Sequence, residues 1–338
     1  MLLGKRRSAN GAGARRPRPI SDHFDGSRFF NPTLPGGFAP TLGSVFKMLR
    51  EPRSRWPRSV ENEGVPQLDM ALANDDIAIT FVNHATFLIQ IGDIAILTDP
   101  IWSERASMFT WLGPRRVRKP GVAFDDLPKI DLVLLSHNHY DHLDLATLNR
   151  LRRCSPTILV AAGDARLVGP LGFADMRELD WWDETPIGEE LSVVFVPAQH
   201  GSARGLFDRQ QSLWGGYMIK SRGRLIYFGG DSGYSTHFAD IRLRLGAPDI
   251  AMLGIGAYEP RWFMQSLHMN PAEAVRAHGD LGAKHSIGMH FGTFQLTPEA
   301  IDQPQADLKA ARSQSGISDK EFVTLREGET RIYRLPPA

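Results

Sequence analysis

The sequence has 338 residues, of which 42% are hydrophobic and 23% are charged, as is usual for a globular protein. Its 39 lysines and arginines nearly balance 38 acidic residues, which excludes a protein that is strongly basic or acidic throughout. The single cysteine, Cys154, excludes an internal disulfide, and no run of about 18 apolar residues predicts a spanning helix. The first twenty residues also lack the apolar stretch of a secretory signal. We therefore expect a cytoplasmic protein that meets a membrane only from the side.

Charge is concentrated at the N-terminal end of the chain. Residues 1–58 hold twelve lysines and arginines against three acidic residues, a local net charge of +9. We predict that residues 1–65 form a basic, Pro/Gly-rich tail and a wrapping arm, with extended chain at 29–40 and a short amphipathic helix at 41–50. The basic tail has two interpretations: a solvated segment, or one that contacts an anionic membrane.

Residues 66–338 are predicted to form a single α/β domain. Three short strands are expected within 76–99, broken at Asn83-His84 and Gly92-Asp93, where turn formers stand. Further strands are predicted at 131–136, 158–162, 191–198, 213–220, 224–230, 249–253 and 285–290. Helices are predicted near 144–154, 163–171, 236–245, 271–281 and 297–312. Ten strands, with helices mainly between the later ones, indicate two sheets covered by helices on the outside.

The stretch LLSHNHYDHLD (134–144) gathers metal-seeking side chains at the end of a buried strand. His137 and His139 are two residues apart, which places both rings on one side of an extended chain. Asp141 and His142 follow where the chain must turn. Open α/β sheets build their sites at the carboxyl ends of strands, and imidazole with carboxylate favours zinc or a similar transition ion.

Four ligands on one short turn cannot all reach one ion without strain, so we searched for other ligands. His200, Asp231 and His290 each follow an apolar strand, and Gly229-Gly230 allows a tight turn before Asp231. Asp99, also at a strand end, is expected to accept a hydrogen bond from a ligand histidine. The histidines outside this pattern are interpreted as structural: His84, His237, His278 and His285.

The segments SHNHYDHLD and GGDSG, with a histidine between them and a late strand-end histidine, resemble the metallo-β-lactamase fold. The segments ELDWW, PAQH, GIGAYEPRWFM and HMNPAEAVRAHGD further resemble N-acylphosphatidylethanolamine-hydrolysing phospholipase D, over about residues 78–330. The resemblance implies a four-layer αββα sandwich with two zinc ions. His137, His139 and His200 would hold one ion, Asp141, His142 and His290 the other, and Asp231 would bridge them. Aspartate stands where β-lactamases of this fold commonly use cysteine, which argues against β-lactam turnover.

The two zinc ions that the resemblance implies would share a hydroxide that attacks phosphorus, so we expect a dizinc hydrolase. His268, before the helix at 271–281, is the candidate for binding the phosphate or donating a proton to the leaving group; its alternative is a helix-capping surface histidine. Tyr258 and Arg261 are candidates for orienting the phosphate. Arg261 could instead form an ion pair with Glu259 or another acid.

Residues 101–121 carry aromatic and other apolar side chains beside four basic residues at 115–119, which fits either peripheral contact with lipid or a packed internal loop. The expected partner is a phospholipid or another phosphodiester, and nucleic acid is not expected, because the basic region is terminal and almost lacks aromatic residues. Two other functions stay open: a lactonase or carboxylic ester hydrolase of the same fold, and a non-catalytic, metal-dependent lipid-binding protein. A monomer and a homodimer both fit the sequence.

Overall fold

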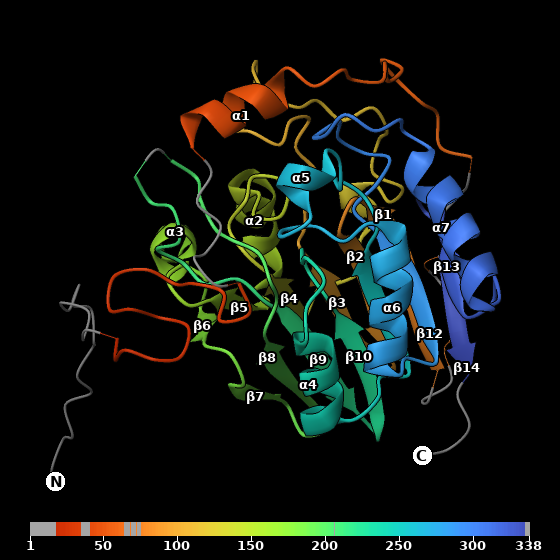
Figure 1. Cartoon of the computed structure of the whole chain (residues 1–338). Coiled ribbons are helices and arrows are strands. Elements are labelled where there is room, and N and C mark those ends of the chain that lie inside the picture. The colour runs from red at the N-terminus through yellow and green to blue at the C-terminus, as the bar shows by residue number, and fades with distance from the viewer. Residues whose placement is uncertain are drawn as a thin grey trace, which may run out of the picture.

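The computed structural model describes residues 18–34, 41–63, 68, 72, 76–205 and 207–334. The predicted tail before residue 18 and residues 35–40 of the extended segment expected at 29–40 lie outside the described residues. Fourteen strands of this described part form two sheets of seven strands that face each other (Figure 1). None of the helices in the described part of the chain is both long and apolar enough to cross a membrane.

The first sheet has the strand order β14-β1-β2-β3-β4-β5-β6. Strands β14 to β3 pair antiparallel, whereas β3 to β6 pair parallel. Its strands, in chain order, are β1 (Asp76–Asn83), β2 (Thr86–Ile91), β3 (Ile94–Thr98), β4 (Leu132–Leu135), β5 (Thr157–Ala161), β6 (Asp175–Leu179) and β14 (Thr330–Arg334).

The second sheet has the order β13-β12-β11-β10-β9-β8-β7, parallel from β13 to β10 and antiparallel from β10 to β7. Its strands, in chain order, are β7 (Glu184–Ile187), β8 (Leu191–Val196), β9 (Gly216–Ser221), β10 (Arg224–Phe228), β11 (Ile250–Gly254), β12 (His285–Met289) and β13 (Phe322–Thr324). Strands β8, β10, β11 and β12 therefore run the same way and present their carboxyl ends at one edge.

Alternating side chains of the first sheet face two different apolar layers. Leu132 and Leu134 of β4 pack into the cluster between the sheets, whereas Val133 and Leu135 pack into a second cluster on the outer face. This follows from the two-residue period of a strand. The outer layer includes Leu148 of a covering helix. A strand with apolar side chains on both sides must therefore be packed against other elements on both faces.

Helices cover both outer faces, which gives the four layers of the predicted αββα sandwich (Figure 1). The first sheet is covered by α2 (Leu145–Leu151) and α3 (Ala165–Val168), and the second by α4 (His237–Leu245), α6 (Pro271–Leu281) and α7 (Gln303–Ser315). Two other helices lie above the sheet edge: α1 (Leu42–Leu49) and α5 (Arg261–Met264). The predicted fold class is confirmed.

Local signals set several of these boundaries. Helix α6 begins at the predicted residue because Asn270 caps it: the Asn270 side chain accepts from the Glu273 amide, and Glu273 accepts from the Asn270 amide. The helix predicted at 297–312 instead spans Gln303–Ser315, with Pro304 in its first turn.

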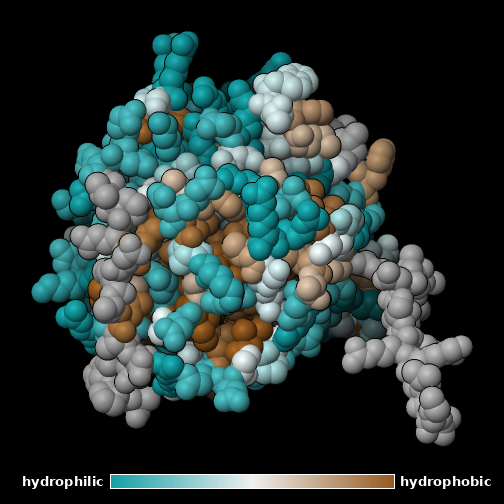
Figure 2. Space-filling model, turned by 180° about the vertical axis from the view of Figure 1, so that it is seen from behind, coloured by the Kyte–Doolittle hydropathy of each residue, from teal (hydrophilic) through white to brown (hydrophobic). Residues whose placement is uncertain are grey.

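The N-terminal arm packs against the sandwich. Phe29 is buried in the apolar cluster between the sheets. The Ser54 amide donates to the Pro298 carbonyl (2.9 Å), and the Trp56 indole donates to the Glu299 carbonyl (2.8 Å). Seen from the side opposite Figure 1, apolar surface gathers near the centre of the face within a mainly hydrophilic border (Figure 2).

Candidate metal centre

The strand ends of both sheets bring the predicted ligands together around one carboxylate. Five imidazole Nε2 atoms lie within 3.9 Å of Asp231 Oδ2, at 3.1 Å (His142), 3.2 Å (His290), 3.8 Å (His200), 3.9 Å (His137) and 3.9 Å (His268). Asp231 follows β10, close to the middle of the second sheet. Residues far apart in the chain meet here because the carboxyl ends of β4, β8, β10 and β12 converge on one region.

His137, His139 and His200 form one half of this cluster. His139 Nδ1 lies 2.9 Å from His137 Nε2 and 3.2 Å from His200 Nε2. Burial, reinforced by neighbouring histidines, holds the pKa of His137 well below its usual value, and burial lowers the pKa of His200 to about 3. These rings are therefore neutral near pH 7, and each neutral ring keeps a lone pair for a cation.

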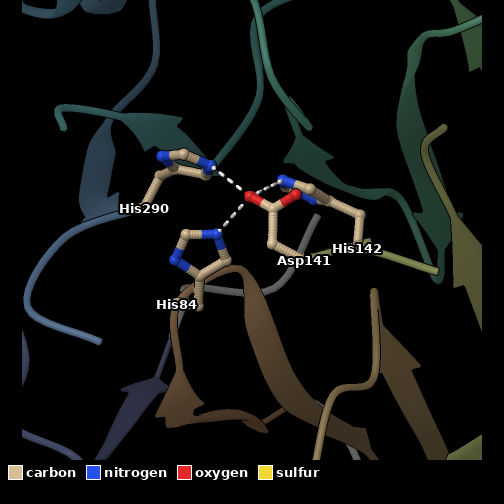
Figure 3. Close-up of side chains that lie close together, drawn as sticks. All are labelled: His84, Asp141, His142 and His290. Carbon is tan, nitrogen blue, oxygen red and sulfur yellow. Dashed lines mark hydrogen bonds and ion pairs between the residues drawn. The ribbon is translucent and has the colours of Figure 1, made fainter. Parts of the chain in front are cut away.

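Asp141, His142 and His290 form the other half, and His84 joins them (Figure 3). Asp141 Oδ2 lies 2.9 Å from His84 Nε2, 3.3 Å from His290 Nε2 and 3.4 Å from His142 Nε2. Burial opposes charge on His142 and His290, but the carboxylates of Asp231 and Asp141 outweigh it. They raise the pKa of His142 well above its usual value and that of His290 to about 9.

The sequence reasoning treated His84 as structural, yet it touches a predicted ligand. Its ring lies 4.0 Å from that of His290, centroid to centroid, and its carbonyl accepts from the His290 amide (2.8 Å). His84 also adopts a left-handed backbone conformation (φ 47°), as do Asp99 (φ 33°) and His290 (φ 66°). Non-glycine residues in this region are uncommon and concentrate at functional sites. A histidine between two strands and beside a turn was the only sequence signal.

Asp99 lies beneath the cluster, where the sequence analysis expected a carboxylate acceptor. Its Oδ2 accepts from His142 Nδ1 (2.7 Å) and from Ser136 Oγ (2.6 Å), and its Oδ1 accepts from the Ser136 amide (2.8 Å). This contact places the proton of His142 on Nδ1 and directs Nε2 toward Asp231. Ser136 Oγ also contacts His137 Nδ1 (2.9 Å). Asp99 therefore contacts His142 directly and is linked to His137 through the Ser136 hydroxyl.

The histidine turn, residues 137–142, is fixed by contacts that the sequence did not reveal. Arg204 Nη1 donates to the Asn138 carbonyl (2.9 Å) and the Leu143 carbonyl (2.8 Å), and its guanidinium lies over the Tyr140 ring. Gly230 has φ +56°, and a Cβ there would lie 2.7 Å from Ser136 Cβ. Only glycine therefore lets β10 approach the start of the turn so closely.

The arm also supports the cluster, through Asn31. Its side-chain amide donates to the His200 carbonyl (2.8 Å), and its oxygen accepts from the His200 amide (3.2 Å) and the Trp214 indole (3.1 Å). His200 Nδ1 in turn donates to the Leu267 carbonyl (3.0 Å). His200 thus connects the N-terminal arm, through its backbone, with the loop before α6, through its ring.

His268, Tyr258 and Arg261, the three candidates for substrate contact, have different surroundings. His268 faces the cluster, with its ring centroid 5.0 Å from that of His200, and it does not cap α6. The Tyr258 hydroxyl donates to Asp307 (2.6 Å) instead. Arg261 donates to Glu273 (2.7 Å) and to the His268 carbonyl (2.9 Å). In the structure Tyr258 binds Asp307, and Arg261 forms the alternative ion pair and fixes the loop that carries His268. Contact of either side chain with a phosphate stays a prediction.

The donor set fits a metal ion. Among the described residues, Asp231 Oδ1 is buried without a hydrogen-bond partner, and His142 Nε2 has only its ion-pair contacts with Asp231 and Asp141. Buried polar atoms are rarely left unpaired, and both atoms are of a kind that binds a cation. Imidazole nitrogens and carboxylate oxygens are the usual ligands of zinc and related ions.

The loop at 101–121 has a packed base and an exposed tip. Its base is packed: the Trp102 indole donates to the Val122 carbonyl (3.0 Å), and Arg116 is buried and donates to the Ser103 carbonyl (2.9 Å). Burial lowers the pKa of Arg116 to about 10. Its tip is exposed, including Phe109 and Trp111. Arg116 is thus a structural cation and not one available to a lipid headgroup.

This fold, with histidines and aspartates gathered at the strand ends, defines a metal-dependent hydrolase of the metallo-β-lactamase class. A family model described as "Beta-lactamase superfamily domain" matches residues 95–291. The chain is 35% identical to an N-acyl-phosphatidylethanolamine-hydrolyzing phospholipase D 1 of Caenorhabditis elegans, over 87% of this chain and 88% of that protein. The chain belongs to the N-acylphosphatidylethanolamine-hydrolysing phospholipase D-like branch of the metallo-β-lactamase fold superfamily, which confirms the resemblance.

Other similarities support the same placement. The mitochondrial N-acyl-phosphatidylethanolamine-hydrolyzing phospholipase D of Saccharomyces cerevisiae is 34% identical over 71% of this chain and 53% of its own length. An isothiocyanate hydrolase from Delia radicum gut bacteria superposes with a TM-score of 0.60 at 24% identity, covering 75% of this chain and 98% of that one. At that identity the solved structure supports the fold alone.

Proposed function

We propose that this protein is a dizinc phosphodiesterase of the phospholipase D type that cleaves N-acylphosphatidylethanolamine-like lipids. The observation that carries the proposal is the convergence of five imidazole nitrogens on Asp231, in a chain similar over most of its length to a protein named for that activity. In the reaction, the oxygen of water joins phosphorus and the bond from phosphorus to the amide-bearing alcohol breaks. The proton released from water ends on the departing alcohol.

The two halves of the cluster suit two cations. His137, His139 and His200 would hold one, Asp141, His142 and His290 the other, and Asp231 would contact both. When bound, such cations supply Lewis acidity that lowers the pKa of a shared water and neutralises charge on the phosphoryl oxygens. Asp99 fixes the tautomer of His142 through the 2.7 Å contact to Nδ1.

His268 is the proposed substrate-binding residue. Burial holds its pKa well below the usual value, so the imidazole is neutral near pH 7. A neutral ring with its proton on Nε2 donates a hydrogen bond to a phosphoryl oxygen, and this role suits it better than transfer of a proton to the leaving group. Arg261 acts through His268, because its guanidinium binds the His268 carbonyl.

The test is a substrate panel on purified, zinc-loaded protein: an N-acylphosphatidylethanolamine, a soluble phosphodiester and a set of lactones. We expect an N-acylethanolamine and phosphatidic acid by mass spectrometry, with no lactone opening above background. The test variant is His268→Ala, which lacks the proposed hydrogen-bond donor. Its matched control is His285→Ala, which changes a histidine on β12 outside the cluster. Lactone turnover alone would assign a carboxylic ester hydrolase, and lipid binding without turnover of any substrate would assign a binding protein.

A further inference from the structure

We propose that one exposed surface of this protein binds an anionic lipid bilayer. The purpose of such binding rests on the lipid substrate proposed above. Two elements form this surface. The loop tip consists of Met108, Phe109, Trp111 and Leu112. The basic arm consists of Arg53, Arg55 and Arg58.

The loop tip exposes large apolar side chains where water would normally exclude them. The exposed fractions are 62% for Met108, 44% for Phe109, 71% for Trp111 and 53% for Leu112. These four residues fall within five positions of the chain, and the Phe109 and Trp111 rings lie 5.4 Å apart. A cluster of this kind usually marks an interaction site.

The loop tip is a projection from a firmly held base. The Ala106 amide donates to the Pro114 carbonyl (3.0 Å), and the Arg116 amide donates to the Glu104 carbonyl (2.9 Å). The buried Arg116 side chain fixes the base from within through the Ser103 and Ile101 carbonyls. A fixed base allows the tip to enter an apolar phase without the cost of ordering a flexible segment.

The basic arm supplies the charge that selects an anionic surface. Arg53, Arg55 and Arg58 are exposed, and none of them pairs with an acidic side chain of the described residues. The arm lies beside the loop base: the Val60 amide donates to the Val117 carbonyl (2.7 Å), and Asn62 Nδ2 donates to the Lys119 carbonyl (2.9 Å). Apolar tips that enter the bilayer beside cations that meet headgroup phosphates are typical of peripheral membrane proteins.

This surface connects directly with the metal centre. The Val117 amide donates to the Thr293 carbonyl (2.9 Å), and the Thr293 hydroxyl accepts from the His84 amide (3.0 Å). Thr293 lies three residues after His290. In Figure 1 the arm and α1 lie at the top of the molecule with α5 just below, whereas α4 lies at the bottom. A bilayer at this edge would therefore meet the side of the fold that carries the cluster.

The experiment measures binding to vesicles without turnover, so that it is independent of the proposed chemistry. Zinc-loaded protein is sedimented with vesicles of phosphatidylcholine alone or with one quarter phosphatidylglycerol. We expect binding to the anionic vesicles only. Phe109→Ser/Trp111→Ser should lower the partition coefficient about tenfold or more. Arg53→Gln/Arg55→Gln/Arg58→Gln should lower it about a hundredfold, since each basic residue near an anionic surface contributes about fivefold.

Leu243→Ser is the matched control, because Leu243 on α4 is 84% exposed and stands away from this surface. It should bind anionic vesicles as the unchanged protein does. Equal binding by the Phe109/Trp111 variant, or absent binding by the unchanged protein, would overturn the proposal. A dimer that this double variant converts to a monomer in light scattering would assign the tip to a second copy and overturn it as well. Intact vesicle binding without lipid turnover would instead count against the proposed function alone.

Discussion

The two halves of the histidine cluster use the same side chain in opposite electrostatic states. In the half with His137 and His200, the Nδ1 atoms contact neutral groups, the Ser136 hydroxyl and the Leu267 carbonyl, and burial lowers the pKa values. In the other half, His142 and His290 face the carboxylates of Asp141 and Asp231, which raise their pKa values. All four rings are buried, so burial alone does not explain the difference in pKa. The number of nearby carboxylates explains it.

This difference has a chemical consequence for metal binding. A cation at the first half meets neutral lone pairs and displaces few protons. A cation at the second half must displace the protons that the carboxylates hold on His142 and His290, so its apparent affinity falls as pH decreases. Asp231 belongs to both halves, since its Oδ2 lies within 4 Å of rings from each.

Removing the shared carboxylate should have the largest effect. Asp231→Ala should lower kcat at least a thousandfold and reduce the zinc content below two ions per chain, because both halves lose a ligand. The fold should persist, because Asp231 contributes no apolar core surface. Metal analysis, turnover and circular dichroism measure these outcomes, with the exposed Asp240→Ala on α4 as control. Two bound zinc ions with an unchanged rate would contradict the shared role of Asp231.

His84 offers a way to affect one half alone. His84→Phe keeps a ring but removes the contact to Asp141 Oδ2 (2.9 Å). The affinity for the second zinc equivalent should fall about 10- to 100-fold, as for other residues that orient a ligand, while the first equivalent binds as before. Calorimetric titration of metal-free protein resolves the two steps, and His285→Phe serves as control. Equal weakening of both steps would indicate general structural damage instead of a positioning role.

A change at Arg204 tests whether the histidine turn needs hydrogen bonds from a distant loop to keep its conformation. Arg204→Ala removes two hydrogen bonds to the turn, at the Asn138 and Leu143 carbonyls. We expect affinity for zinc at the first half to fall about tenfold, because His137 and His139 flank Asn138. Arg150→Gln, which breaks an exposed pair with Asp125, should change nothing measurable. A normal zinc titration for Arg204→Ala would show that the strand ends alone position the turn.

The sequence predicted the centre of the fold better than its edges. All ten predicted strands are present, and the four that it missed are the four edge strands: β6, β7, β13 and β14. An edge strand is short and has polar residues on its open side, so it lacks the apolar run that marks a central strand. β7 (ETPI) even contains a proline, which sheets tolerate at an edge.

The site shows a similar limit. Side chains at strand ends were recognisable because the strand pattern predicts where each strand ends, and the structure brings all seven predicted ligands together. Arg204, Asn31 and His84 were missed because their contacts depend on loops from distant parts of the chain. Tyr258 and Arg261 follow a strand as well, but Asp307 and Glu273 bind them, and no local pattern reveals those partners.

The smallest expected effect concerns Asp164, a carboxyl beside the histidine turn, and the pH dependence of stability. This buried carboxyl accepts from Asn138 Nδ2 (3.0 Å), and burial raises its pKa to about 7. The folded state therefore binds more protons than the unfolded state between about pH 4 and 7, so this group makes stability fall as pH rises through that window. Asp164→Asn does not titrate. The decline in unfolding free energy from pH 5 to 8 should be smaller in the variant by about 2–3 kcal/mol, measured by denaturant unfolding of zinc-loaded protein. An identical decline in both proteins would mean that the pKa of Asp164 in the folded state lies outside the range from pH 5 to 8.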